Sequence, residues 1–295
     1  MGEKSKIEWT DTTWNPWQGC HKVSPGCLNC YMFAEKKRYG QDPNVVVRSK
    51  PRTFNLPLRL REPRLVFTCS WSDFFIEEAD EWRPEAWDII AATPHLTYQI
   101  LTKRIERVAG LLPWGDGKPW DNVWILVSVE DQKRADERIP ILLCTNAAVR
   151  GVSIEPMLGP IDVARYVWPV HQPWPSPYKS PEEAVEAGAT LPPKRRQALV
   201  SAACTFIDWV IVGGESGPNA RPMHPDWARS IRDQCVTAGV PFFFKQMGEW
   251  AQTDGPVNCV DPEQAPYPTF ARVGKKVAGC ALDGRTWDEM PEVRT

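Results

Sequence analysis

The sequence predicts an α/β fold built on a parallel sheet. Three observations lead to this expectation: short apolar runs recur along the chain, stretches with helical spacing separate them, and polar side chains follow each run. Runs that are apolar at almost every position are typical of strands buried on both faces, as in parallel sheets. Their alternation with helical stretches gives repeated βα units.

The individual elements follow in order along the chain. Six runs rich in apolar and β-branched residues are expected to be strands, at 65–69, 98–102, 123–127, 149–154, 207–212 and 240–244. Four intervening segments have helix-like apolar spacing, with acidic residues near several starts and a glycine closing the last. These predicted helices cover 84–92, 105–112, 131–143 and 225–239, and a further one begins at Cys30.

We expect one main domain over residues 1–250, with an insertion at 164–205 and a C-terminal extension at 251–295. The gap between the fourth and fifth runs is too long for an ordinary connection in a compact domain. It holds five prolines between 169 and 181 and an acidic, alanine-rich helix candidate over 181–189. An inert surface excursion is the equal alternative for this insertion. The extension has weak periodicity and is expected to pack as an irregular cap.

The composition indicates which broad class of protein the chain belongs to. The 295 residues are 42% hydrophobic and 24% charged, enough for a core of substantial size. No long apolar stretch or apolar leader is present, so we expect a cytoplasmic protein without a membrane partner. Six of the nine cysteines are scattered singly, unlike a disulfide framework. The net charge of −2 provides no global attraction to nucleic acid. Binding of nucleic acid would therefore require a local basic patch on the protein.

Three clustered cysteines, Cys20, Cys27 and Cys30, form the most informative motif. Turn-forming residues lie between the first two, so we expect a loop that brings the thiols around one point. Thiolates bind soft metals, and a four-iron cluster normally takes four of them, so three would leave one iron open. The alternative is a structural zinc site completed by His21 or a remote cysteine, because closed zinc sites require four ligands.

Polar side chains follow the predicted strands and form a second pattern. Because catalytic and binding groups of parallel α/β folds gather at the C-terminal ends of strands, we expect these residues to face one site. For the carboxylates, helix capping or an ion pair is an equal alternative. The candidate residues are Ser70, Ser72, Asp73, Lys103, Arg104, Ser128, Glu130, Ser153 and Glu155.

With these motifs the chain resembles the radical S-adenosylmethionine superfamily. The Cys27 to Cys30 interval and the aromatic Tyr31 match the superfamily's three-cysteine motif, whereas the first interval holds six residues instead of three. More narrowly, the segments 14–17 and 153–156 and the cysteines are similar to a phage- and prophage-associated three-cysteine-motif family of unassigned function. The resemblance implies a full or partial TIM-like (βα) barrel, a [4Fe-4S] cluster and S-adenosylmethionine, which the cluster cleaves to a 5′-deoxyadenosyl radical.

The resemblance also implies roles for the strand-end residues. Ser70, Ser72 and Asp73 are candidates for the methionine amino group, because an ammonium offers only donors. Lys103 or Arg104 would pair with the methionine carboxylate. Ser128 and Glu130 would hold the ribose hydroxyls, and Ser153 and Glu155 would do the same or meet the substrate. The superfamily's Gly-Gly-Glu motif normally follows the second strand, but here it follows a late one, at residues 213–215, so its role is not carried over.

Two classes of function follow from the motif. The first is a radical enzyme served by an electron donor such as a flavodoxin or ferredoxin, with nucleic-acid repair or modification as the first expectation and a peptide or metabolite as the second. A protein partner is compatible with it. Within this class Cys69 is a candidate hydrogen-atom donor, although a buried free cysteine more commonly only packs. The second is a zinc-stabilised binding or structural phage protein without turnover.

Overall fold

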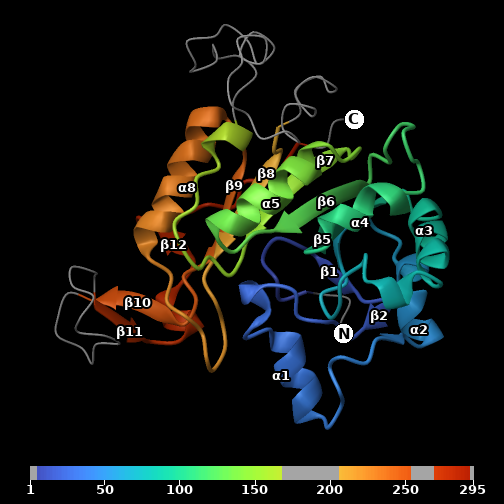
Figure 1. The fold of residues 1–295 in the computed structure, drawn as a ribbon, viewed down its shortest axis with the longest axis horizontal. Helices are drawn as coiled ribbons and strands as arrows, with labels where there is room; N and C mark the ends of the chain where they lie inside the picture. Colours follow the sequence, from blue (N-terminus) through green and yellow to red (C-terminus); the bar gives the residue numbers. More distant parts are fainter. Residues whose placement is uncertain (1–4, 168–205, 254–268, 293–295) are drawn as a thin grey trace, which may run out of the picture.

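The computed structural model describes residues 5–167, 206–253 and 269–292. Its centre is a seven-stranded, all-parallel sheet in the order β1-β4-β5-β6-β7-β8-β9, curled into a half-barrel (Figure 1). The expected parallel sheet is confirmed, and the curled half-barrel is consistent with the partial form of the barrel. The strands are β1 (Thr12–Trp14), β4 (Arg64–Thr68), β5 (Leu96–Thr102), β6 (Val123–Ser128), β7 (Val149–Ile154), β8 (Trp209–Gly213) and β9 (Phe242–Gln246).

All six predicted strands are present, with small shifts at their ends. The fifth and sixth begin two residues later than predicted, at Trp209 and Phe242. The first strand of the sheet, β1, was not among the predicted runs, because three residues with two threonines give no apolar run. Cys69 lies outside β4 and has a left-handed backbone with φ of 63°, so it begins the turn that follows that strand.

Helices follow most of the strands. Four predicted helices and the one expected after Cys30 are found, although the 105–112 helix divides into an α-helical and a 3-10 turn. The α-helices are α1 (Tyr31–Arg38), α2 (Pro51–Phe54), α3 (Arg83–Ala91), α4 (Ile105–Val108), α5 (Gln132–Leu143), α8 (Pro225–Ala238) and α9 (Lys275–Ala278). The 3-10 turns are η1 (Pro25–Cys27), η2 (Pro57–Arg59), η3 (Glu77–Ala79), η4 (Ala109–Leu111) and η5 (Ala164–Tyr166).

Helix boundaries follow local chemistry. Asp131 caps α5 by accepting a hydrogen bond from the Arg134 amide at 2.8 Å. Pro225 occupies the first turn of α8, and Gly239 ends that helix with φ of 67°, a conformation that favours glycine. No helix in the described ranges has both the length and the apolar character required to cross a membrane.

Both faces of the sheet are buried, which explains why the strand sequences are continuously apolar. Val66, Ile125 and Val210 pack into the larger core shared with the helices. Their neighbours in the strands point to the other face and form a second cluster with Trp9, as the two-residue period of a strand requires. This second cluster contains Phe67, Trp124, Leu126, Val149, Trp209, Ile211 and Phe243.

Short elements complete the described chain. The strands β2 (Trp17–Gln18) and β3 (Val47–Arg48) pair antiparallel, as do β10 (Trp250–Thr253) with β11 (Thr269–Arg272) and β12 (Ala281–Leu282) with β13 (Arg285–Thr286). The extension contacts the edge strand β9, where the Phe244 amide donates to the Trp287 carbonyl at 2.8 Å. Residues 168–205, most of the expected insertion with its helix candidate, lie outside the described residues.

Candidate functional site

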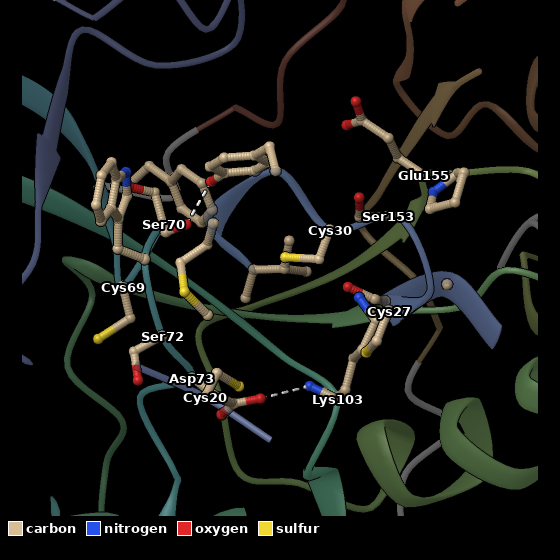
Figure 2. A pocket seen from close by; sticks show the side chains of 18 of the residues that line it. Cys20, Cys27, Cys30, Cys69, Ser70, Ser72, Asp73, Lys103, Ser153 and Glu155 are labelled. Atoms are coloured by element: carbon tan, nitrogen blue, oxygen red, sulfur yellow. Dashed lines mark hydrogen bonds between the residues drawn. The ribbon is translucent and has the colours of Figure 1, made fainter. Parts of the chain in front are cut away.

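A cavity of about 490 Å³ lies at the C-terminal ends of the strands, and the cysteine loop borders it (Figure 2). This volume falls within the range of small-molecule sites in proteins. All but one of the residues proposed from the sequence line it. They are Cys20, Cys27, Cys30, Cys69, Ser70, Ser72, Asp73, Lys103, Arg104, Ser128, Ser153 and Glu155; the exception is Glu130.

The three motif cysteines come from one compact loop. The 3-10 turn η1 ends at Cys27, whose amide donates to the Ser24 carbonyl at 2.9 Å, and Cys30 is the N-cap residue of α1. All three thiols are free and partly exposed. Figure 2 shows them arranged around a shared space. Glycine is required at Gly19, just before the loop, since its φ is 100° and a Cβ there would sit 2.2 Å from the Val45 carbonyl oxygen.

Arg104 fixes the start of the loop. Its guanidinium donates to the Cys20 sulfur at 3.7 Å and to the His21 carbonyl at 3.3 Å. Asp73 in turn holds Arg104 through an ion pair at 3.2 Å, and both side chains are buried. Arg104 is therefore a cation fixed beside the first thiol, and its carboxylate partner keeps it there.

Glu130 fixes the middle of the loop. One carboxylate oxygen accepts from the Gly26 amide at 3.0 Å, and the other pairs with Arg138 at 3.1 Å. Glu130 is only 1% exposed. Burial alone would raise its pKa, but hydrogen bonds from Ser24 and Gly26, with the charges of Lys103 and Arg138, hold it below its usual value. Its role in ribose binding stays a prediction and would compete with these contacts.

Glu215 fixes the end of the loop. It accepts from the Asn29 side chain at 3.0 Å and pairs with Arg221, whose guanidinium also donates to the Pro25 carbonyl at 3.1 Å. The glutamate of the late Gly-Gly-Glu motif thus holds the cysteine loop. Asn29, Arg138 and Arg221 were not predicted from the sequence, because nothing in their local sequence distinguishes them from ordinary polar residues.

The turn after β4 is also internally bonded. The two oxygens of Asp73 accept from the Phe75 and Lys103 amides, at 3.0 and 2.9 Å, besides the Thr102 hydroxyl and Arg104. Ser72 donates to the Gly19 carbonyl at 2.5 Å, and Ser70 exchanges hydrogen bonds with Asn15. Asp73 is consequently engaged within the protein.

Other cavity groups retain free hydrogen-bonding capacity. In the part of the chain that the structure describes, no hydrogen-bond partner is found for the hydroxyls of Ser128 and Ser153 or for the Lys103 amine. Glu155 pairs with Lys245 at 2.5 Å, and both are partly exposed to the cavity. The free groups supply one cation and two hydroxyls to a bound molecule.

Cys69 and Cys20 both have thiols that favour the protonated form. Burial, followed by the Asp73 charge, raises the pKa of Cys69 well above its usual value. The same two causes, opposed by Arg104, raise the pKa of Cys20 to about 11. A metal that binds Cys20 must therefore displace a proton.

The donor set fits an iron–sulfur cluster with three protein ligands. Three free thiols of one loop border a cavity with room beside them, and thiolates are the ligands that such clusters use. His21, which with a remote cysteine is one of two candidates for the fourth ligand in the zinc alternative, is turned to Glu78, which its Nε2 contacts. Within the described ranges, no group of three or more His, Cys, Asp or Glu side chains is placed to hold a metal ion.

The chain belongs to a known family. Residues 4–291 match the family described as "Protein of unknown function (DUF5131)", which covers nearly the whole chain. Neither the curated proteins nor the solved structures gave a match.

Proposed function

We propose that this member of the DUF5131 family is a cytoplasmic radical S-adenosylmethionine enzyme. The observation that carries the proposal is the convergence of three free cysteines from one loop on a cavity at the C-terminal edge of a parallel half-barrel. Cys20, Cys27 and Cys30 would hold a [4Fe-4S] cluster. When bound, such a cluster leaves one iron for S-adenosylmethionine and supplies the electron that cleaves it.

The protein's part is to bind and orient the ligands. The Lys103 amine, which has no hydrogen-bond partner in the described residues, would pair with the methionine carboxylate. The Ser128 and Ser153 hydroxyls are free to bond with ribose hydroxyls. Because Asp73 and Arg104 already neutralise one another, we assign them to holding the loop rather than to binding methionine.

The substrate would lie beyond S-adenosylmethionine, near Glu155 and Lys245. Nucleic acid remains the first expectation for its class and a peptide or metabolite the second. Cys69 would keep its proton, which a hydrogen-atom donor requires, and its burial would shield it from competing oxidants.

The test begins with anaerobic reconstitution of the purified chain with iron and sulfide. We expect about four irons per chain, and 5′-deoxyadenosine after addition of S-adenosylmethionine and dithionite. Cys30→Ala should abolish both. Cys144→Ala is the matched control because Cys144 is exposed and outside the cavity lining. If the protein is colourless, contains one zinc and cleaves no S-adenosylmethionine, the zinc-stabilised alternative is correct and the proposal is wrong. If the Cys30→Ala and Cys144→Ala variants are equally active, the ligand assignment is wrong.

A further inference from the structure

The surface around the cysteine loop differs from the rest of the described molecule in its apolar exposure. Among the described residues, seven large hydrophobic side chains that are exposed lie between 23 and 58, and two lie elsewhere. On the cysteine loop itself Val23 is 45% and Leu28 is 60% exposed. A cluster of this kind on an otherwise polar surface marks an interaction site.

The same segment is strongly basic. Residues 23–58 contain six lysines and arginines but two acidic residues, within a chain whose net charge is −2. The exposed side chains of Lys37 and Arg38 lie at the end of α1, which projects from the half-barrel beside the cysteine loop (Figure 1). The only ion pair found for either in the described ranges is a distant contact of Arg38 with Glu35, at 3.9 Å. Their charge is thus available to a partner.

Backbone and side-chain contacts link the segments that carry these residues. The Gln41 amide donates to the Lys36 carbonyl, so the chain returns along α1. The Cys20 amide donates to the Pro43 carbonyl, and this bond places residues 43–45 against the cysteine loop. Lys22 lies over the Phe33 ring of α1, 5.1 Å from its centroid. We call this surface the α1 face; its exposed basic and apolar members are Lys22, Val23, Leu28, Lys37, Arg38, Tyr39, Val45 and Val47, and it also carries the exposed Asp42.

We propose that the α1 face is the docking surface for a small acidic electron-carrier protein, an inference that rests on the proposed function. The α1 face combines exposed apolar and basic side chains, and transient protein interfaces likewise combine apolar contacts with charged residues; weak redox complexes use small interfaces. Opposite charges steer the encounter. Val23 lies three residues after Cys20, and Leu28 directly follows Cys27. A protein docked here therefore sits over the loop that would hold the cluster.

In the docked complex the carrier is oxidised by one electron and the cluster is reduced by one, from the 2+ to the 1+ state. No proton or covalent bond is exchanged between the proteins. Because electron transfer weakens steeply with distance, a surface formed by the ligand loop itself gives a short path.

The character of the exposed residues favours a protein over nucleic acid. Val23, Leu28, Val45 and Val47 are aliphatic and cannot stack on bases, whereas single-stranded nucleic acid binds to aromatic platforms lined by cations. Tyr39 is the aromatic member of the face, and the other exposed tyrosine of this segment, Tyr31, lines the cavity. A nucleic-acid ligand is therefore the competing occupant, and the experiment includes it.

The experiment compares two double variants of equal charge change. Lys37→Glu/Arg38→Glu changes the α1 face, and Lys133→Glu/Lys276→Glu changes exposed residues on α5 and α9. A third variant, Val45→Ser/Val47→Ser, removes apolar surface without changing charge. Each is measured for equilibrium binding of purified oxidised flavodoxin by calorimetry at low and high salt, for binding of a single-stranded oligonucleotide, and for S-adenosylmethionine cleavage driven by dithionite or by flavodoxin hydroquinone.

We expect the α1-face charge variant to bind flavodoxin at least about tenfold more weakly than the control variant, with the difference shrinking at high salt. Its flavodoxin-driven cleavage should fall in parallel while dithionite-driven cleavage stays at the wild-type level. The valine variant should weaken binding at both salt concentrations. Equal flavodoxin binding by the charge variant and its control would overturn the proposal, as would loss of oligonucleotide binding alone.

The outcomes also separate this inference from the proposed function. If dithionite drives no cleavage in the wild-type protein, the proposed function has failed and the docking surface fails with it. If dithionite drives cleavage in every variant but flavodoxin distinguishes none of them, only the docking surface is wrong.

Discussion

Replacement of Glu130 by glutamine tests whether a buried ion pair holds the cysteine loop. Glu130 is 1% exposed and Arg138 is 7% exposed, and their charged groups meet at 3.1 Å. Glutamine preserves the shape of the side chain but removes its charge. The Arg138 guanidinium is then left buried with the Ser128 carbonyl, 2.8 Å away, as its remaining partner.

The expected loss is large because an uncompensated charge remains in the interior. Breaking a buried ion pair by removing one partner costs about 3–5 kcal/mol. We expect a loss near the lower end of this range, since the Ser128 carbonyl still accepts from Arg138. Urea unfolding followed by circular dichroism at neutral pH measures the free energy of unfolding. Glu137→Gln is the matched control, because Glu137 pairs with Arg134 at the surface and such pairs contribute about 0–1 kcal/mol.

A double variant separates stability from loop positioning. Glu130→Met/Arg138→Met removes both charges, and replacing a buried pair by apolar residues is often neutral. It should recover most of the stability lost in the single variant. The Gly26 amide nevertheless loses its acceptor, so iron loading should stay below wild type. If Glu130→Gln costs no more than Glu137→Gln, the buried pair does not have the role that we assign to it.

Three further predictions concern single side chains. Lys103→Met should weaken S-adenosylmethionine binding to the reconstituted protein, measured by calorimetry, by about tenfold or more, since a charged hydrogen bond contributes about 1.5–3 kcal/mol. Lys133→Met is the control, and an equal effect of the two variants would refute the assignment. Cys69→Ala should retain wild-type iron content, and loss of iron would instead make Cys69 a ligand. Burial would raise the pKa of Glu215, but hydrogen bonds from Arg221 and Asn29 hold it below the usual 4.5, so its contribution to stability is present above that pH and is lost as the pH falls below it. In the Glu215→Gln variant, the free energy of unfolding measured by urea titration should therefore fall less than in wild type as the pH is lowered below 4.5. The same pH dependence in both proteins would contradict this.

Much of the sheet could be predicted because its strands are buried on both faces. Val123–Ser128 is fully buried along its length, and a short, almost continuously apolar run is typical of an interior strand in a parallel sheet. By contrast β1 is three residues long, and β2 and β3 are two each, so tertiary pairing rather than local sequence defines them. The rule that polar groups gather at strand ends correctly placed Lys103 and Ser153 at the cavity.

The same rule could not tell which polar groups are free. Lys103 and Glu130 look equally available in the sequence, yet Glu130 binds Gly26, 104 residues away. Glu215 binds Asn29 at a separation of 186 residues. Such partners become neighbours only when the half-barrel has formed, and spacing along the chain carries no signal for them.

The three anchors of the cysteine loop have a consequence for how the proposed cluster would enter and leave. Arg104, Glu130 and Glu215, which follow the ends of three separate strands, hold the loop with bonds that involve no metal. In zinc fingers, removal of the ion with a chelator unfolds the domain, because the ion itself joins the ligands. Here the framework is preassembled, so chelation should empty the site while the melting temperature changes little, and reloading should need no refolding.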